Sequence, residues 1–186
     1  MPNFLAYCYL TFILIYNLLF HRIFMKTLIL VRHAKSSWEY DVIDHERPLN
    51  KRGQNDALML SKHVKSKNLT IDLVLSSDAV RAKTTADIFM DNLNISQELF
   101  RLNHNLYDFS GENLTQTIKQ CDDSINHLMI FGHNHAITSF VNTYGDKYID
   151  NVPTCGVTII EFEIDFWKNL NQGKTISTLF PRDLKS

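Results

Sequence analysis

The sequence predicts an α/β fold: a three-layer, doubly wound and mostly parallel sheet with helices on both faces and an antiparallel hairpin at one edge. From residue 26 onward, short apolar runs alternate with segments whose apolar residues recur at helical spacing. The central runs are continuously apolar, which is typical of strands that are buried on both faces. The last two strand-like runs are joined by a turn near residues 171–173, which favours an antiparallel hairpin.

The first elements follow from these patterns. Residues 27–31 form a short β-branched apolar run and are expected to be the first strand. A long polar loop is expected over residues 32–49. Residues 54–67 are expected to form a helix, because apolar side chains recur there on one face: Ala57, Leu58, Leu60 and Val64.

The next segment repeats the strand–helix order. Residues 71–75 are expected to form a second buried strand that ends at "SSDAVRA". Asp78 is expected to cap a helix that continues to Met90, since a carboxylate can accept the unpaired amide protons of a first turn. Residues 98–102 are expected to form a short strand.

The remaining elements complete the alternation. A loop is expected at "NHNLYDFSGEN", and the sequence "GHNH" directly follows the third buried strand. We expect helices over residues 113–120 and 136–144, and strands over residues 128–131, 157–164 and 175–180.

Length and composition limit the class of protein. The chain has 186 residues, which suits one domain with a sizeable core. Its formal net charge of −1 provides no global basic field, so we expect no nucleic-acid partner. The three cysteines, Cys8, Cys121 and Cys155, are widely scattered. This pattern indicates reduced thiols and predicts a cytoplasmic protein.

The first 24 residues form a separate apolar appendage in this interpretation. Residues 4–20 are almost wholly apolar but lack the basic region and cleavage site of a secretory signal. Two readings stay open: a membrane anchor that leaves the domain in the cytoplasm, or a misassigned start upstream of Met25. Residues 25–186 are expected to form the functional domain, and we expect a membrane partner only if residues 4–20 are a real anchor.

Cation-capable side chains follow three of the predicted strands. Arg32 and His33 follow the first strand, Arg81 follows the second, and His133 follows the third. Ligands of such sheets bind outside the carboxyl ends of the strands, so these residues are expected to form one site. Taken alone, Arg32 and His33 would be a solvated strand end, Arg81 a surface residue, and His133 a structural histidine with its hydrogen bonds satisfied.

This set of residues suits phosphoryl transfer. A neutral imidazole has a lone pair that can attack phosphorus, and neighbouring arginines disfavour its protonation. Arginine also binds phosphate oxygens through two parallel hydrogen bonds. We therefore expect His33 to be the nucleophile, and Arg32, Arg81 and His133 to bind the phosphoryl oxygens.

The motifs resemble those of a known family. The segments "LVRHAKSSW", "DHERPLNKRGQNDA", "LVLSSDAVRAKTTA", "LYD" and "IFGHNHAI" are similar to those of the histidine phosphatase (phosphoglycerate mutase-like) superfamily, and most closely to its SixA-type phosphohistidine phosphatase branch. The resemblance covers residues 26–164. It implies a phosphoglycerate mutase-like fold, a metal-independent phosphatase without a cofactor, and a phosphorylated protein or small phosphorylated compound as the substrate.

The resemblance also implies roles for individual residues. His33 corresponds to the phosphorylated nucleophile, and Arg47 of the R-P-L stretch lies near the pocket. The sequence departs from the family in having Ala34 where glycine is usual. It also lacks a clear match to the general-acid glutamate of many members. Asp108 is the nearest candidate acid, with Glu112 as the reserve, and Asp108 can also be read as an ordinary loop carboxylate.

Two other functions remain open at this point. His133 and His135 have ligand-like spacing, so a metal-dependent hydrolase is one alternative. A catalytically silent phosphate-binding module is the other, because a fold alone does not establish catalysis.

Overall fold

The computed structural model describes residues 25–184. One six-stranded sheet runs through it in the order β3-β2-β4-β1-β5-β6. Its strands are β1 (Met25–Arg32), β2 (Leu73–Ser76), β3 (Phe100–Leu102), β4 (His127–Gly132), β5 (Val157–Glu163) and β6 (Lys174–Leu179).

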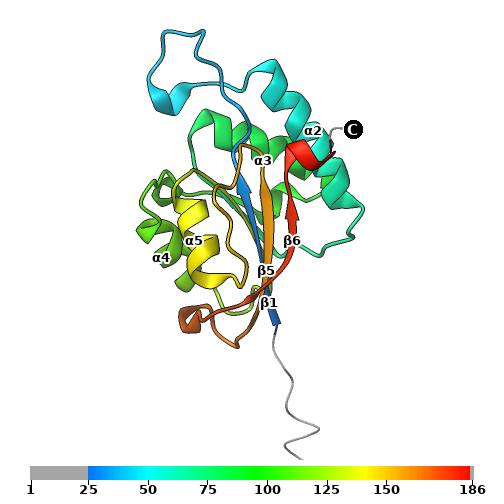
Figure 1. Ribbon diagram of the computed structural model, residues 1–186, viewed down its shortest axis with the longest axis vertical. Coiled ribbons are helices and arrows are strands. Elements are labelled where there is room, and N and C mark those ends of the chain that lie inside the picture. Colours follow the sequence, from blue (N-terminus) through cyan, green and yellow to red (C-terminus); the bar gives the residue numbers. More distant parts are fainter. Residues whose placement is uncertain (1–24, 185–186) are drawn as a thin grey trace, which may run out of the picture.

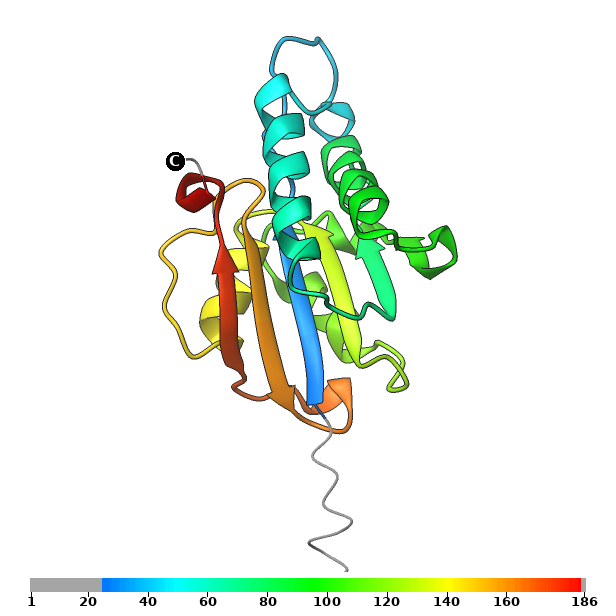
Figure 2. The ribbon, with the colours of Figure 1, turned by 90° about the vertical axis from the view of Figure 1, so that its right-hand side faces the viewer.

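The sheet is mixed but mostly parallel. Strands β1 to β4 pair in parallel, whereas β5 runs antiparallel to β1, and β6 runs antiparallel to β5. Figure 2 shows this sheet face-on, with the β5–β6 hairpin at one edge. The predicted fold class and its antiparallel edge hairpin are confirmed.

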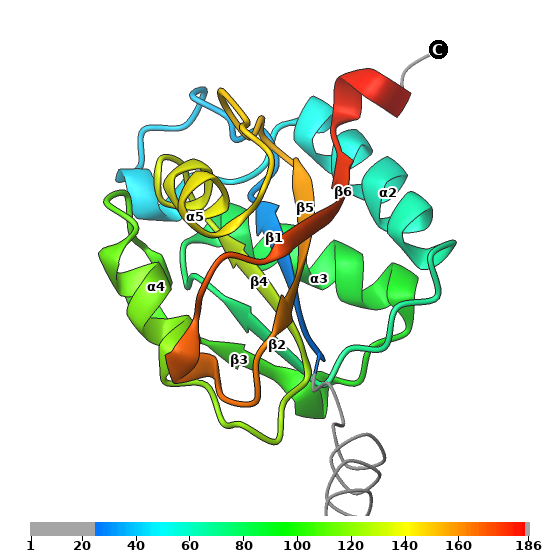
Figure 3. The same cartoon turned by 60° about the horizontal axis from the view of Figure 1, so that its bottom comes forward.

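Helices cover both faces of the sheet (Figures 1 and 3). Helices α2 (Lys51–Lys65) and α3 (Val80–Leu93) pack on one face, and α4 (Glu112–Lys119) and α5 (Ala136–Tyr144) pack on the other. Side chains of β1 alternate between the two cores: Leu28 and Leu30 join one, and Ile29 and Val31 join the other. This explains why the first strand is continuously apolar.

Short 3₁₀ helices lie in the connecting loops and after the last strand. They are η1 (Asp44–Glu46), η2 (Gln97–Leu99), η3 (His104–Leu106), η4 (Trp167–Asn169) and η5 (Pro181–Leu184). Segments η1 and η3 lie in the loops that follow β1 and β3. They therefore shape the end of the sheet at which the candidate site was predicted.

Two helix starts differ from prediction. Helix α2 begins three residues early because the Asn50 side chain accepts a hydrogen bond from the amide of Gly53 and caps the first turn. Asp78 does not cap α3: the cap position is Ala79, without a side-chain hydrogen bond. The Asp78 carboxylate instead contacts the imidazoles of His45 and His104.

Boundaries of the second and third strands also differ from the prediction. The second strand spans Leu73–Ser76 rather than 71–75. Only Phe100–Leu102 of the predicted 98–102 strand is extended, because Gln97–Leu99 forms a 3₁₀ turn that the Ser96 side chain caps. Both changes lie at element ends, where local propensity is weakest.

The apolar segment 4–20 lies outside the described residues. Within residues 25–184, no helix has the length and hydrophobicity that crossing a membrane requires.

Candidate active site

The parallel strands bring the predicted residues to one edge of the sheet. Arg32 is paired with Gly132 across β1 and β4, and the amide of His33 donates to the Gly132 carbonyl at 3.0 Å. The amide of Ser77 donates to the Phe131 carbonyl at 3.0 Å. The residues that follow β1, β2 and β4 are therefore neighbours, as predicted from their positions at strand ends.

The imidazole of His33 is held in one tautomer. Its Nδ1 lies 2.8 Å from the carbonyl oxygen of Ala34. A carbonyl oxygen only accepts, so Nδ1 carries the proton and Nε2 carries a lone pair. The Nε of Arg81 donates to this Nε2 at 3.3 Å. The nitrogen that carries the lone pair thus faces the guanidinium of Arg81.

The His33 ring is also kept neutral. Burial lowers the pKa of His33 to about 3, and the charges of Arg81, Arg32 and Arg47 act in the same direction. The hydrogen bond to Ala34 opposes them but is outweighed. A lone pair on Nε2 is therefore present throughout the neutral pH range.

His133 lies beside His33. The two ring centroids are 5.0 Å apart, and the His133 side chain is almost completely buried. Its Nδ1 accepts a hydrogen bond from Nη2 of Arg81 at 3.3 Å, and its Nε2 lies 2.9 Å from the hydroxyl of Ser77. Burial lowers the pKa of His133 to about 2, assisted by the neighbouring His33 ring and by the charge of Arg81.

Arg81 is the common partner of both histidines, and it also binds an unpredicted carboxylate. Its Nη2 donates to Oδ2 of Asp44 at 2.8 Å, and its Nη1 donates to the Asp44 carbonyl oxygen. Asp44 is in addition bound by Arg47 at 2.8 Å and by the Tyr107 hydroxyl at 2.7 Å. Burial alone would raise the pKa of Asp44, but hydrogen bonds from Tyr107, Arg47 and Arg81 hold it well below its usual range. The Asp44 carboxylate is therefore already bound to Arg81 where a phosphate oxygen would bind.

Arg32 and Arg47 differ in how much of each guanidinium is available. Arg32 donates from Nη1 to the Val152 carbonyl at 2.7 Å, whereas its buried Nε has no hydrogen-bond partner among the described residues. Arg47 lies against the face of the Trp38 ring at 3.2 Å. All three of its nitrogens are bonded within its own loop, to Ser36, Ser37 and Asp44. These contacts give Arg47 a role in shaping the loop after β1.

The contacts of Asp108 favour the structural reading of this carboxylate. Oδ2 accepts from the amides of Gly111 and Leu114, each at 3.0 Å, and Oδ1 accepts from the amide and hydroxyl of Ser110. Burial would raise the pKa of Asp108, but these hydrogen bonds lower it. Such a carboxylate secures the start of α4 and is poorly suited to donate a proton. Glu112, the reserve acid, is exposed at the first position of α4.

The metal alternative finds no support in the placement of His133 and His135. His133 is buried and His135 is exposed. In residues 25–184, neither belongs to a group of three side chains with metal-ligand atoms close together. The one such group contains His45, Asp78 and His104 instead.

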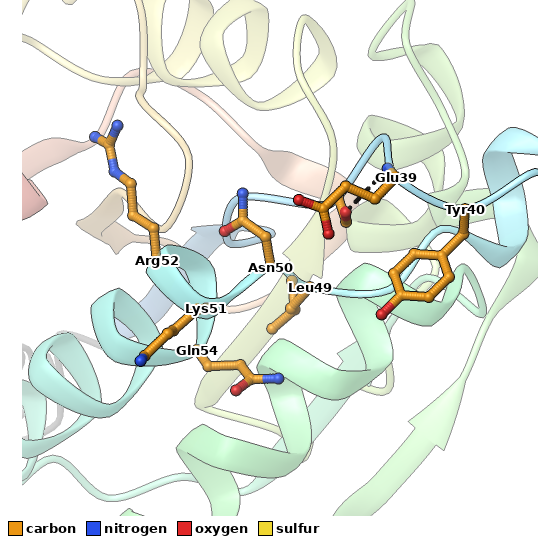
Figure 4. A pocket seen from close by; sticks show the side chains of 8 residues that line it. Glu39, Tyr40, Leu49, Asn50, Lys51, Arg52 and Gln54 are labelled. Atoms are coloured by element: carbon orange, nitrogen blue, oxygen red, sulfur yellow. Dashed lines mark hydrogen bonds between the residues drawn. The ribbon is translucent and has the colours of Figure 1, made fainter.

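A polar hollow lies beside the predicted site (Figure 4). It separates the loop after β1 from the start of α2, and Glu39 and Tyr40 face the first residues of that helix across it. It is lined by Ser37, Glu39, Tyr40, Leu49, Asn50, Lys51, Arg52 and Gln54. None of the buried histidines or of the arginines bound to them lines it, so this hollow is a neighbouring surface feature.

Three residues of the site were missed by sequence reasoning: Asp44, Ser77 and Tyr107. Ser77 stands next to the strand end, so its place beside His133 could have been found from the "SSDAVRA" segment. Asp44 and Tyr107 reach the site from η1 and from the residue after η3. The spacing of apolar residues predicts helices and strands, but it does not predict where the side chains of such loops lie.

Fold and site together define a class: a doubly wound α/β protein with buried, neutral imidazoles and arginines at the carboxyl edge of its sheet. The sequence profile of the histidine phosphatase superfamily (branch 1) matches residues 28–103. That segment contains Arg32, His33, Asp44, Arg47 and Arg81. Over these residues the chain is similar to the histidine phosphatase superfamily.

Curated relatives are distant and lack an assigned activity. An uncharacterised chloroplast protein of Arabidopsis thaliana is 29% identical over 153 residues, covering 77% of this chain and 69% of its own. An uncharacterised protein of Mycobacterium tuberculosis is 23% identical over 153 residues, covering 77% of this chain and 93% of its own.

Solved structures share the fold. The protein histidine phosphatase SixA complexed with tungstate superposes with a TM-score of 0.70 at 17% identity, covering 86% of this chain and 99% of its own. The putative SixA of Agrobacterium tumefaciens gives 0.67 at 22% identity, covering 83% and 97%. The phosphoglycerate mutase of Bacillus anthracis gives 0.63 at 16% identity, covering 86% and 95%. The phosphoglycerate mutase-like fold is thus confirmed.

Proposed function

We propose that this protein is a metal-independent phosphatase that acts through a covalent phosphohistidine on His33. The observation that carries the proposal is the orientation of the His33 ring. Its Nδ1 is fixed on the Ala34 carbonyl, and its unprotonated Nε2 faces Arg81. A nucleophile with a fixed lone pair beside a phosphate-binding cation is the arrangement that in-line phosphoryl transfer requires.

The first step transfers the phosphoryl group to the enzyme. The His33 Nε2 lone pair attacks phosphorus, the bond to the leaving group breaks, and the leaving group keeps the electron pair. Arg81 and the unpaired Nε of Arg32 stabilise the equatorial oxygens. The substrate phosphate displaces the carboxylate of Asp44 from Arg81, a movement that the partly exposed Asp44 side chain can make. In the second step water attacks the phosphohistidine, releasing orthophosphate and neutral His33.

We infer that His133 assists from its position beside His33. Its Nδ1 faces Arg81 and its Nε2 faces Ser77. When Arg81 turns to the substrate, the neutral His133 ring can lose its Nε2 proton to solvent and take one up on Nδ1. The Ser77 hydroxyl then donates to Nε2, and the Nδ1 proton is available to the phosphoryl oxygens. Ser77 thereby positions His133 for hydrogen bonding to the transition state.

We propose phosphohistidine on a protein as the preferred substrate, with other small phosphate compounds as the broader class. An alkoxide leaving group needs a proton in the transition state, whereas an imidazole released from phosphohistidine needs less help. The contacts that engage Asp108 leave no clear general acid, which supports the phosphohistidine substrate. The relatives of known structure include SixA, a protein histidine phosphatase.

A substrate panel tests the proposal. Purified protein is offered a phosphohistidine-bearing protein, a sugar phosphate and an aryl phosphate, with His33→Ala as the control. We expect the phosphohistidine protein to have the largest kcat/KM, and we expect His33→Ala to be inactive on all three. Efficient hydrolysis of sugar phosphates with phosphohistidine left untouched would contradict the substrate assignment.

The two remaining alternatives give different results. A metal-dependent hydrolase loses activity after exhaustive chelation, whereas the proposed enzyme keeps it. A silent phosphate-binding module binds orthophosphate but turns over none of the panel.

We further propose that residues 25–186 form the functional domain and that it works in the cytoplasm. The scattered cysteines support a reducing compartment. A protein mass measured from the native source tests whether the segment before Met25 belongs to the mature chain.

A further inference from the structure

A cluster of metal-ligating side chains lies beside the proposed site and has no part in the mechanism above. It joins His45 of η1, Asp78 of the loop after β2 and His104 of η3. His45 Nε2 lies 2.9 Å from one oxygen of Asp78, and His104 Nδ1 lies 2.8 Å from the other. One ligand atom from each residue lies within 4.8 Å of the others.

We propose that these three side chains bind a zinc ion. Two imidazole nitrogens and one carboxylate oxygen, with a fourth position left for water, are a ligand set that zinc takes in proteins. Tetrahedral zinc with bonds of about 2.0–2.2 Å places its ligand atoms roughly 3.3–3.6 Å apart. The three groups therefore need only small side-chain rotations to reach coordination distances.

The surroundings of this cluster are compatible with a bound divalent cation. His45 and Asp78 are each 29% exposed, and His104 is 74% exposed, so the cluster opens to solvent on one side. Arg81, a buried cation of the adjacent site, is already paired with the Asp44 carboxylate. Imidazole and carboxylate ligands favour zinc over the hard cations magnesium and calcium, which prefer oxygen alone.

The position of the cluster links it to the site. The Tyr107 ring lies between, with its centroid 5.1 Å from that of His45 and 5.2 Å from that of His133. His45 follows Asp44, which occupies Arg81. A zinc ion on His45 and Asp78 ties η1 to the start of α3 and holds Asp44 on Arg81. Zinc is therefore expected to slow turnover, a consequence that rests on the proposed function.

Zinc binding is tested without substrate. The full chain is stripped of metal and titrated with zinc against a chromophoric chelator, as wild type, His104→Ala and Asp78→Asn. The matched control is His127→Ala, because His127 forms a comparable pair with Asp72 at the opposite end of β4. We expect wild type and His127→Ala to bind one more zinc ion per chain than His104→Ala and Asp78→Asn. Zinc should raise the Tm of wild type and His127→Ala only.

The outcomes separate the two claims. Equal zinc binding by wild type, His104→Ala and Asp78→Asn, or no binding by wild type, would show that the cluster is only a pair of histidine–carboxylate hydrogen bonds. If zinc binds as expected but leaves turnover unchanged, the site stands and its link to Asp44 is wrong. If wild type and every variant lack phosphatase activity, the proposed function is wrong, and the zinc site is judged by the binding titration alone.

Discussion

At the scale of single residues, the central feature is a pair of buried histidines that stay neutral. Burial lowers the pKa of His33 to about 3 and that of His133 to about 2. An unfolded histidine titrates near 6.5, so below that pH the unfolded chain binds protons that the folded chain does not. Folding stability is therefore present in full above pH 6.5 and falls as the pH drops toward the folded-state values.

This asymmetry predicts a pH-dependent free energy of unfolding. Near pH 5, each of the two histidines is expected to contribute a slope of about 1.4 kcal/mol per pH unit. His133→Gln removes one titrating ring and should reduce the slope by about that amount between pH 4.5 and 6. Urea unfolding measured across this range checks it. An identical slope in the variant would show that His133 is already protonated in the folded protein.

The contact between Asp44 and Arg81 predicts that a substitution of Asp44 changes anion binding. Its carboxylate competes with phosphate for Arg81, so Asp44→Asn is expected to lower the Kd for orthophosphate several-fold. Calorimetric titration of wild type and variant measures the change. Asp41→Asn removes a carboxylate from the same loop and serves as the control. Weaker phosphate binding in Asp44→Asn would mean that Asp44 orients Arg81 instead of competing for it.

At the scale of elements, the first turn of α2 supports the loop that carries His33. A Cβ at Gly53 would lie 2.2 Å from the carbonyl oxygen of Lys35, which is a backbone atom of that loop. The same carbonyl accepts the amide of Asn50, the cap of α2. Helix and loop are thus packed backbone to backbone, and only glycine fits between them.

Gly53→Ala should therefore disturb both stability and activity. The added methyl group must displace the Lys35 backbone, at a cost of about 1–3 kcal/mol in the free energy of unfolding. Because Lys35 lies two residues from His33, kcat is expected to fall at least tenfold. Denaturant unfolding and steady-state kinetics measure the two effects. The exposed neighbour Gln54→Ala should change neither, and an active Gly53→Ala would contradict the proposed role of this contact.

A variant of Asp108, which lies before α4, distinguishes its structural role from a role as general acid. If Asp108 secures the start of α4, Asp108→Asn lowers the free energy of unfolding by about 1–2 kcal/mol and leaves the kcat of the folded fraction near that of wild type. A large fall in kcat at the pH optimum, without a change in stability, would restore Asp108 as the general acid.

The elements also show what could be predicted and why. Apolar runs on β1, β2 and β4 predicted the parallel strands, and parallel strands end at a common edge of the sheet. The proximity of the residues after these strands could therefore be predicted from the sequence: Arg32, His33, Arg81 and His133. Asp44 and Tyr107 could not, because tertiary contacts set the conformations of η1 and of the loop after η3. Asp78 was misassigned as a helix cap because local propensity cannot show that two distant histidines compete for its carboxylate.

At the scale of the whole molecule, the two cores lie on opposite faces of one sheet, and β1 contributes to both. The six strands and the four helices that cover them are all formed by residues 25–184. We therefore predict that a chain of residues 25–186 folds cooperatively with the Tm of the full chain and retains its kcat/KM. Thermal unfolding and kinetics of the two chains make the comparison. A fragment that is inactive or unfolded would show that residues 1–24 contribute to the domain.

We propose that turnover passes through a phosphoryl group on His33. The most direct measurement is to mix the protein with a ³²P-labelled phosphohistidine protein, quench in alkali within milliseconds, and map the label by mass spectrometry. We predict an acid-labile, alkali-stable phosphate on His33 of wild type and of the control His127→Ala, and none on His33→Ala. Turnover by a folded His33→Ala, or label that persists on that variant, would rule out a phosphorylated His33 intermediate.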